Sequence, residues 1–543
     1  MKKIIYLAIG FLFIACGTKE QVKTESDISD ISVKEFTKFK VLDSENIENQ
    51  TIWSSLDTEM VDFPETEYER LKPYILEKNI LELHKSRVQG IFTYEKLVKF
   101  YLYRIKKYDR NNELSLNAVI RINPNIIAEA KQKDQEFFNK RLKPLIFGMP
   151  ILLKDNINTK NMPTTAGAVA LKDNYTKDAF IVQRLKQEGA LILGKANLSE
   201  WAYFFCGDCP SGYSAIGGQT LNPYGRKTID TGGSSSGSGV SVAANFAVAA
   251  VGTETAGSIL SPASQNSVVG LKPTIGLLSR SGIVPISSTL DTPGPMTKNV
   301  IDNAILLATL FGYDASDPKS KNPKWTKHYY FTDIKSGNVS LKGKRFGAFT
   351  RLLKDTLYIE AINILKQQGA IIVEIEEEKI NLPKFINLLN LDMQKDLPAY
   401  FENYASKELS YTSVQDIIDF NKKDSLKTMP YGQKLFYGIV NDKANKKELK
   451  DLKKVLYDNG KSYFDIPMKE HNLDGVLSIN NYHAAFAAVA EYPALTVPMG
   501  YTNKGEPKGL TFIGKPFTEK NLLEFAYVYE QASKKRKAPK NYN

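Results

Sequence analysis

Apolar runs of strand length alternate with amphipathic segments of helical length over most of the chain. Such alternation predicts an α/β fold in which a large mixed β-sheet is covered by helices on both faces. The helical segments lie at residues 97–105, 126–138, 179–188 and 358–368, and from about 518 onward. The strand-like runs lie at residues 116–122, 144–155, 190–195, 344–349, 370–375, 474–479, 493–500 and 509–514.

Local signals define some of these elements more closely. Thr93 can cap the first helical segment and Asp178 can cap the third, which Gly189 then ends. The run at 144–155 is apolar at successive positions rather than at alternate ones. This pattern predicts a strand that is buried on both faces of the sheet.

The composition is that of an ordinary globular protein. Of 543 residues, 42% are hydrophobic and 24% are charged, which is enough apolar material for a large core. Residues 65–540 contain no repeat and no proline-rich linker, so we expect a single domain there. Within it, residues 320–470 are polar, lysine-rich and irregular, and we expect them to form peripheral helices that shape a substrate entrance.

The chain begins with MKKIIYLAIGFLFIAC. Two lysines precede a mainly apolar stretch from Ile4 to Ala15, which is too short to cross a bilayer and predicts a signal peptide at 1–15. The ending FIAC resembles the lipobox of bacterial lipoproteins. That resemblance implies a lipid on Cys16, a polar tether over 16–60, and a cell-envelope protein anchored to a bacterial membrane and facing the periplasm or the exterior. Secretion without a lipid is the alternative.

The charge distribution bears on possible partners. The formal net charge is +12, but Lys and Glu are interspersed, and the dense basic cluster is confined to residues 534–537. Proteins that bind nucleic acid more often concentrate their charge on one element, so we expect no nucleic-acid partner. Membrane contact is expected through the lipid anchor only.

Two cysteines remain after Cys16, in the sequence CGDC. Cys206 and Cys209 could form a local disulfide or stay as free thiols, and a redox role is also open. A zinc site would need two further ligands. All the histidines are distant in the sequence, so we expect no metal; they are His84, His328, His471 and His483.

The run GGSSSGSG at residues 232–239 could be a linker, a phosphate loop or a site of serine chemistry. Small apolar residues follow it, as in the centre of a domain, which argues against a linker. A Walker loop would need a lysine after the last glycine, and a dinucleotide fingerprint would need a third glycine at its offset. Serine chemistry is the interpretation that survives.

One form of serine chemistry would use Ser235. Residues 233–237 match G-x-S-x-G, the motif of an α/β-hydrolase nucleophile, and His471 or His483 could supply the base. That motif follows directly on a buried strand. Here the preceding residues are NPYGRKTIDT, which are polar and turn-rich, so an esterase of this type is the weaker alternative.

The other form rests on separated motifs that strongly resemble the amidase signature family. GMPILLKDNI, GGSSSGSG, GTETAGS, SPAS and GLKPT occur in the family's order, and the C-terminal EYPALTVPMG and GLTFIGKPFTE look most like its peptide-amidase branch. The resemblance implies a basic residue at Lys154, a bridging serine at Ser234 and an acyl-forming nucleophile at Ser258. Ser236 and Ala256 depart from the family pattern, and both are small.

The chemistry of such a triad can be argued from the residues. Serine needs a base, and a lysine at the end of an apolar strand is desolvated, which lowers its pKa toward the working range. In the family, the peptide bond before the bridging serine is cis, which here implies Gly233–Ser234. The amides of the small-residue turn before Ser258 can point together at an oxyanion. We expect the oxyanion donors at Thr255, Ala256 and Gly257, together with Ser258.

These features predict an amidase that hydrolyses carboxylic amides, and peptide C-terminal amides in particular, to acid and ammonia. The substrate would be a small-molecule or peptide amide, and no metal or organic cofactor is expected. Two alternatives stay open. The chain could be the glutamine-hydrolysing subunit of a tRNA-dependent amidotransferase, or a catalytically idle binding lipoprotein. The oligomeric state is not predicted.

Overall fold

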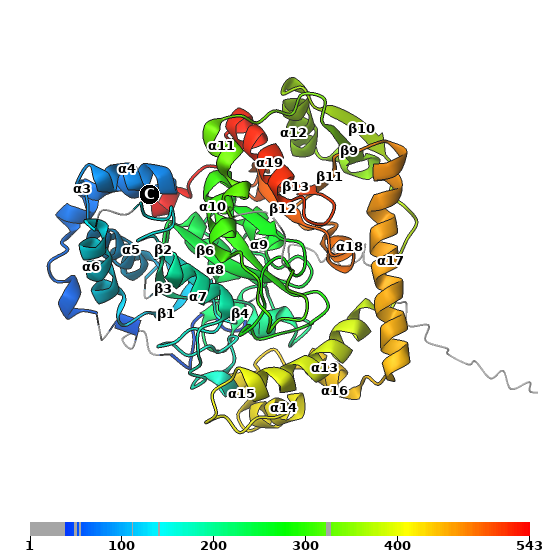
Figure 1. Cartoon of the computed structure of the whole chain (residues 1–543). Coiled ribbons are helices and arrows are strands. Elements are labelled where there is room, and N and C mark those ends of the chain that lie inside the picture. The colour runs from blue at the N-terminus through cyan, green and yellow to red at the C-terminus, as the bar shows by residue number, and fades with distance from the viewer. Residues whose placement is uncertain (1–38, 48–51, 54–55, 111, 140–141, 322–326) are drawn as a thin grey trace, which may run out of the picture.

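The computed structural model describes residues 39–47, 52–53, 56–110, 112–139, 142–321 and 327–543 (Figure 1). The predicted signal peptide and Cys16 lie outside these residues, as does much of the predicted tether. The described residues at 39–47 lie against the domain, because the Leu42 carbonyl accepts a hydrogen bond from the Gln219 amide at 2.8 Å.

One mixed β-sheet runs through the molecule. In the described residues it has eleven strands, and β4 and β5 form a separate two-stranded ladder. The large sheet contains parallel pairs, such as β2 with β3 and β6, and antiparallel pairs, such as β6 with β8. In sheet order the strands are β1 (Val119–Ile122), β3 (Leu191–Ala196), β2 (Pro150–Lys154), β6 (Ala249–Glu254), β8 (Thr292–Thr297), β7 (Val269–Lys272), β12 (Ala494–Tyr501), β13 (Pro507–Ile513), β11 (Gly475–Ile479), β9 (Arg345–Phe349) and β10 (Ile371–Ile375); the small ladder is β4 (Tyr213–Ser214) and β5 (Gly218–Gln219).

Helices cover both faces of this sheet. The strands β2, β3, β6, β7, β8 and β11 are buried at every position, which requires cover on each side. The predicted α/β fold is therefore confirmed. The helices are α3 (Glu65–Ile75), α4 (Ile80–Val88), α5 (Tyr94–Tyr108), α6 (Ile126–Phe137), α7 (Phe180–Gln187), α8 (Ser236–Ala243), α9 (Leu260–Gln265), α10 (Val300–Leu310), α11 (Thr332–Ser336), α12 (Thr356–Gln367), α13 (Phe385–Asn403), α14 (Val414–Lys422), α15 (Ser425–Thr428), α16 (Lys434–Asn441), α17 (Lys446–Glu470), α18 (Ala484–Val489) and α19 (Glu519–Ser533).

Of the two predicted helix caps, Thr93 is confirmed and Asp178 is not. Thr93 caps α5 as predicted, since its side chain accepts the Lys96 amide at 3.1 Å. The cap at Asp178 was wrong. Helix α7 starts at Phe180 without a side-chain cap, because the Asp178 carboxylate accepts from the Lys160 amide and from the Lys186 ammonium instead.

Three central strands carry no clear strand signal in the sequence. β6, β7 and β8 read AAVGTE, VGLK and TPGPMT, and the prolines of β8 argue against a strand. Pro293 and Pro295 are two residues apart, so both missing N–H groups fall on the same edge of the strand. Strand β7 pairs with β8 only at the far end, at Met296 and Thr297, where these prolines do not interfere.

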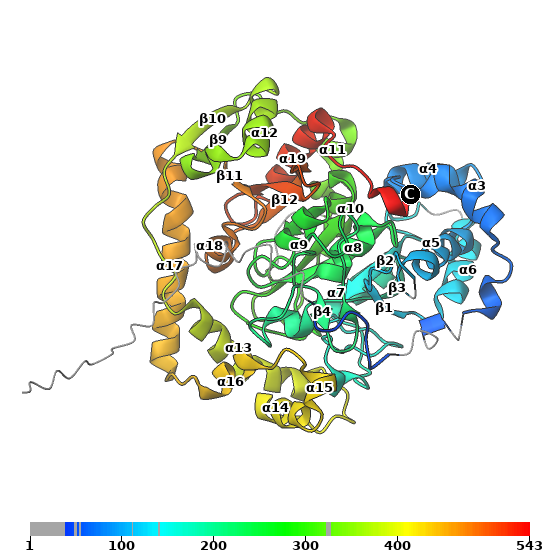
Figure 2. The ribbon, with the colours of Figure 1, turned by 180° about the vertical axis from the view of Figure 1, so that it is seen from behind.

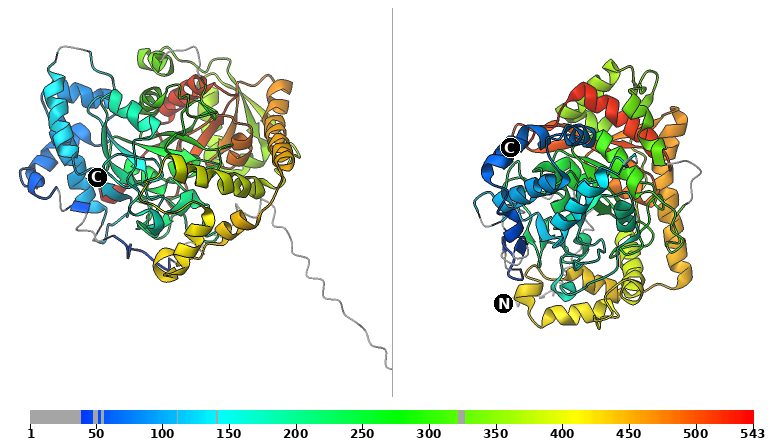
Figure 3. Two further views of the ribbon diagram at one scale, coloured as in Figure 1. Left: turned by 60° about the horizontal axis from the view of Figure 1, so that its bottom comes forward. Right: turned by 60° about the vertical axis from the view of Figure 1, so that its left-hand side comes forward.

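The polar region predicted at 320–470 lies mainly at the periphery. Helices α13 to α16 gather along one side of the molecule (yellow in Figure 3), around an apolar cluster that includes Trp201 and Phe436. Helix α17 runs along the edge opposite α3 to α6 (Figure 2). Among the described residues, no helix combines the length and the apolar character needed to cross a membrane.

Candidate active site

The site begins where two parallel strands end. β2 and β6 are neighbours in the sheet, with Leu153 opposite Val251. Parallel neighbours end at the same edge, so Lys154, the last residue of β2, lies beside Thr253 near the end of β6. The turn that carries Ser258 follows directly on β6. This topology places the basic residue next to the nucleophile loop.

Lys154 contacts the bridging serine. Its Nζ donates to Ser234 Oγ at 2.7 Å and to the Thr253 carbonyl at 3.0 Å, and the side chain is fully buried. Burial lowers the pKa of Lys154 from 10.5 to about 7, while the carboxylates of Asp291 and Glu254 oppose that shift. A lysine with this pKa is about half neutral at pH 7, and its neutral form can accept a proton.

Ser234 is held by the loop before α8. The Gly233–Ser234 peptide bond is cis, as the resemblance implied, and the Ser234 carbonyl accepts from the Ser199 amide at 3.0 Å. A Cβ on Gly233 would lie 2.7 Å from Ser199 Oγ, so a larger residue would displace this hydroxyl, which accepts the Gly212 amide at 2.8 Å. Glycine at this position therefore keeps the hydrogen bond between Ser199 and Gly212 undisturbed.

Ser258 lies beside the same loop and is more accessible. The Ser235 amide donates to the Ser258 carbonyl at 3.1 Å, which joins the two serine-bearing segments. Ser258 is half-buried, whereas Ser234 and Lys154 are wholly buried. The structure thus brings all three predicted catalytic residues into one place, with Ser258 at its open end.

The turn before Ser258 is held by two buried carboxylates. Glu254 accepts the Ile259 amide at 2.7 Å, directly after the nucleophile. Thr255 Oγ1 donates to Asp291 at 2.5 Å. Gly257 has φ +103°, a left-handed conformation that other residues rarely adopt. The predicted oxyanion residues Thr255, Ala256 and Gly257 therefore lie in a turn fixed on both sides.

Asp291 is a site residue that sequence reasoning missed. Besides Thr255 it accepts the Ile286 amide at 2.8 Å and the Ser287 amide at 2.9 Å, and burial raises its pKa to about 6. It belongs to the stretch STLDTPGPMT at residues 288–297. No signal in the sequence marks this acid, because its burial and the strand β8 that follows it are features of the folded chain.

The alternative nucleophile is contradicted by the structure. Ser235 is fully buried, and its Oγ donates to the Thr253 carbonyl at 3.0 Å. The Ser235 side chain packs against Gly252, since a Cβ added to Gly252 would lie 2.8 Å from Ser235 Oγ. Its proposed base His483 instead contacts Ser478 at 2.6 Å and Glu377 at 3.0 Å. Ser235 is therefore a structural residue between α8 and β6.

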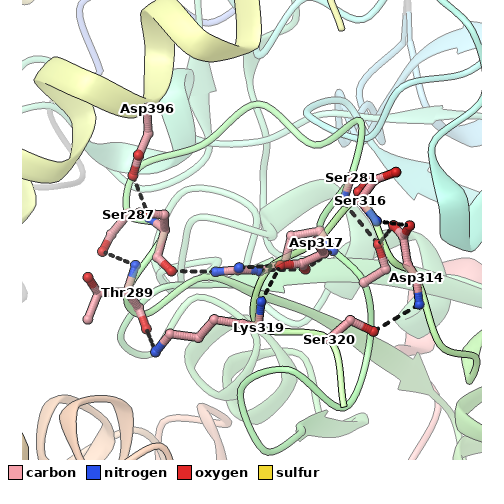
Figure 4. Close-up of polar contacts among 12 residues, drawn as sticks. Ser281, Ser287, Thr289, Asp314, Ser316, Asp317, Lys319, Ser320 and Asp396 are labelled. Atoms are coloured by element: carbon pink, nitrogen blue, oxygen red, sulfur yellow. Dashed lines mark hydrogen bonds and ion pairs between the residues drawn. The ribbon is translucent and has the colours of Figure 1, made fainter. Parts of the chain in front are cut away.

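A cavity of about 880 Å³ adjoins the turn. Thr253, Thr255 and Asp291 line its inner end, and α13 and α17 form its outer wall. Polar contacts also link the lining segments at residues 280–289 and 317–319. Arg280 donates to Asp317, and Lys319 donates to the Thr289 carbonyl (Figure 4). The cavity thus extends from the serine-bearing turn to helices of the 320–470 region.

The structure answers whether the two cysteines are bonded or free. Cys206 and Cys209 form a disulfide with their Cα atoms 5.8 Å apart. Within the ranges that the structure describes, no group of three or more His, Cys, Asp or Glu side chains could hold a metal ion.

A layered α/β fold with two serines beside a buried lysine of lowered pKa, at the end of a central strand, is an arrangement typical of serine hydrolases. The sequence profile of the family described as Amidase matches residues 96–438. The chain belongs to the amidase family, whose members are hydrolases that act on amides.

Individual proteins agree with this assignment. A probable amidase of Arabidopsis thaliana is 36% identical over 86% of this chain and 92% of its own length. The crystal structure of an amidase family protein from Bacillus anthracis has a TM-score of 0.85 at 38% identity, over 92% of this chain and 99% of that one. The native peptide amidase of Stenotrophomonas maltophilia has a TM-score of 0.80 at 38% identity, over 86% of this chain and 98% of that one.

Proposed function

We propose that this protein hydrolyses the C-terminal amides of peptides to the free acid and ammonia, through an acyl-enzyme on Ser258. The observation that carries the proposal is the 2.7 Å contact of Lys154 Nζ with Ser234 Oγ, in a buried place that lowers the lysine pKa to about 7. Neutral Lys154 can take the hydroxyl proton of Ser234 as Ser234 takes that of Ser258.

Acylation follows from this proton transfer. Ser258 Oγ attacks the amide carbon, and the carbonyl electrons move onto oxygen, where amides of the turn at 255–258 stabilise the negative charge. Collapse of the tetrahedral intermediate breaks the C–N bond. The proton held by Lys154 returns through Ser234 to the leaving nitrogen, so ammonia departs and an ester remains on Ser258.

Deacylation repeats the steps with water. Water gives a proton to Ser234, which passes one to Lys154, and the hydroxide oxygen attacks the ester carbon. The second intermediate breaks the bond to Ser258 Oγ, which regains a proton from the same path. The overall reaction consumes one amide and one water and yields one carboxylic acid and one ammonia, and the triad is restored.

A peptide substrate is supported by two observations. The cavity beside the turn, at about 880 Å³, is within the range of sites that bind small ligands, so it has room for an acyl group of peptide size. The overall similarity to the Stenotrophomonas peptide amidase extends over 86% of the chain. Cavity-lining residues such as Leu388, Tyr400 and Leu456 come from helices of the 320–470 region, which supports the proposal that this region shapes the substrate entrance.

Ammonia release by the purified protein tests the proposal. We expect turnover of dipeptide amides at rates at least about tenfold above those of short aliphatic amides, because the cavity contacts the additional residue. Free glutamine should be a poor substrate. Glutaminase activity that requires added partner subunits would instead support an amidotransferase subunit, and binding of peptide amides without ammonia release would support an idle binding protein.

We also propose that Cys16 is lipid-modified and anchors the enzyme in the bacterial cell envelope, on the strength of the FIAC sequence after an apolar stretch. Several acyl chains on one cysteine would hold the protein firmly, at about 0.8 kcal/mol for each buried methylene. Labelled fatty acid should enter the wild-type protein and a Thr18→Ser control, and should be absent from Cys16→Ser. An unlabelled wild-type protein released freely from cells would contradict the anchor.

A further inference from the structure

The basic side chains around the cavity are mostly neutralised by neighbouring acids. Arg280 forms a forked contact with Asp317, and Lys453 Nζ lies 2.7 Å from Asp392. Two further pairs complete the set: Lys319 with Glu491 and Lys454 with Asp458. Lys395 also lines the cavity and is exposed. These pairs leave little net positive charge to attract an acidic substrate.

The other acids of the lining are engaged more fully than Asp396: Asp317 and Glu491 are paired with cations, and Asp291 accepts three hydrogen bonds in a buried place. It is half-buried on α13, and its carboxylate accepts the Ser288 amide at 2.6 Å. Figure 4 shows it pointing from its helix toward the loop that carries Ser287 and Thr289. Within the described residues, no ion pair joins Asp396 to a basic side chain. The Ser288 amide and hydroxyl occupy two of the several acceptor sites of this carboxylate, and the others stay open.

Asp396 is only partly compensated, because Arg280, already paired with Asp317, and Lys395 act on it electrostatically without forming an ion pair. Desolvation raises its pKa, and the nearby Asp392 carboxylate adds to that effect, while hydrogen bonds from the Ser288 amide and the Ser288 hydroxyl, and the charge of Lys395, oppose it. A partly desolvated carboxylate gains more from pairing with a cation than an exposed one does, because water screens the pair less. Asp396 is therefore a favourable place for a positive group of a ligand.

The helix carries this carboxylate on the face that lines the cavity. Asp396, Ala399, Tyr400 and Asn403 all line it, at spacings of three, four and seven residues, which place them on one face of α13. Tyr400 is fixed because its hydroxyl donates to Asn158 Oδ1 at 2.7 Å. An ammonium group can pair with a carboxylate and is also attracted to the face of a nearby aromatic ring.

We infer that Asp396 binds an ammonium group of the substrate, on the part of the peptide that lies away from the scissile amide. This inference rests on the proposed function and specifies its substrate class: peptide amides with a free amino terminus, or with a lysine side chain before the last residue. The carboxylate determines specificity and takes no part in the bond-breaking steps, so its loss should affect KM and leave kcat unchanged.

Matched substrates separate the two sources of the ammonium group. Glycyl-leucinamide has a free amino terminus, N-acetyl-glycyl-leucinamide has no cation, and N-acetyl-lysyl-leucinamide has a side-chain ammonium only. In Asp396→Asn, KM should rise about tenfold for a substrate whose ammonium reaches Asp396, the size expected for a partly buried ion pair. KM for N-acetyl-glycyl-leucinamide should change less than twofold. Asparagine keeps an acceptor for the Ser288 amide, so the fold should be retained.

The controls distinguish the inference from the proposed function. Asp419→Asn removes an exposed carboxylate on α14 and should leave KM unchanged for all three substrates. Equal KM changes for the acetylated glycyl substrate and the charged substrates in Asp396→Asn, or no change for either charged substrate, would overturn the role of Asp396. Failure of the wild-type protein to hydrolyse any of the three amides would instead overturn the proposed function.

Discussion

Replacing Ser258 by alanine should lower kcat/KM for a peptide amide by about 10⁴-fold or more, because no acyl-enzyme can form without this hydroxyl. Loss of a nucleophile from a catalytic triad costs nearly the whole contribution of the triad. The structure places Ser258 at the accessible end of the buried Lys154–Ser234 pair. Ammonia release measures the rate, and covalent labelling by a fluorophosphonate, followed by mass spectrometry of the labelled peptide, identifies the residue.

Ser235→Ala is the matched control. Ser235 belongs to the same glycine-serine run, but its hydroxyl is buried against the Thr253 backbone. The variant should keep its fluorophosphonate label and most of its activity. Labelling that persists in Ser258→Ala and disappears in Ser235→Ala would reverse the assignment of the nucleophile.

Replacing Lys154 by methionine should be nearly as damaging, by about 10³-fold or more in kcat/KM. Methionine fills the buried space without offering a base. In the wild-type protein, kcat/KM should rise with pH through about 7 and then level off, because Lys154 accepts a proton only in its neutral form and its pKa is about 7. Lys154→Arg should stay inactive at all pH values, since arginine remains charged. A flat profile between pH 5 and 9 would contradict this role.

The same lowered pKa can be measured without catalysis. Between pH 7 and about 10, unfolded wild-type protein carries a proton on Lys154 that the native state lacks, given a native pKa of about 7 against 10.5. The free energy of unfolding of the wild type should therefore rise relative to Lys154→Met by about 1.4 kcal/mol for each pH unit in this window. Below pH 7 the difference should stay constant. Denaturant unfolding of both proteins across this range provides the test.

Much of the site could be predicted from the sequence, because its chemistry depends on local features. A turn of small residues leaves room for neighbouring groups to approach closely, as Gly233 does for the Ser199 hydroxyl. An apolar strand that ends in a charged residue indicates a buried base, and Lys154 is that residue. The strands β9 to β13 were predicted for a similar reason, since their aliphatic and aromatic runs have strand length and clear turns on either side.

The sequence was less informative where residues far apart in the chain act together. β6 and β7 each contain a glycine and β8 contains two prolines, residues that are rare in strands, and all three form strands because the sheet around them supplies their neighbours. The alternative at Ser235 depended on whether a histidine lies nearby, and only the folded chain placed His483 against Ser478. Asp178 had the sequence position of a cap, but Lys186 and the Lys160 amide bind its carboxylate instead.

By itself, the sequence determined the α/β class, the motif residues Lys154, Ser234 and Ser258, and the order in which they occur. Tertiary structure decided that burial sets the pKa of Lys154 near 7 and that Asp291 braces the turn before Ser258. It also decided that one face of α13 lines the cavity. The physical reason is that a motif specifies which groups are present, whereas desolvation, charge pairing and cavity shape depend on which distant segments the fold brings against them.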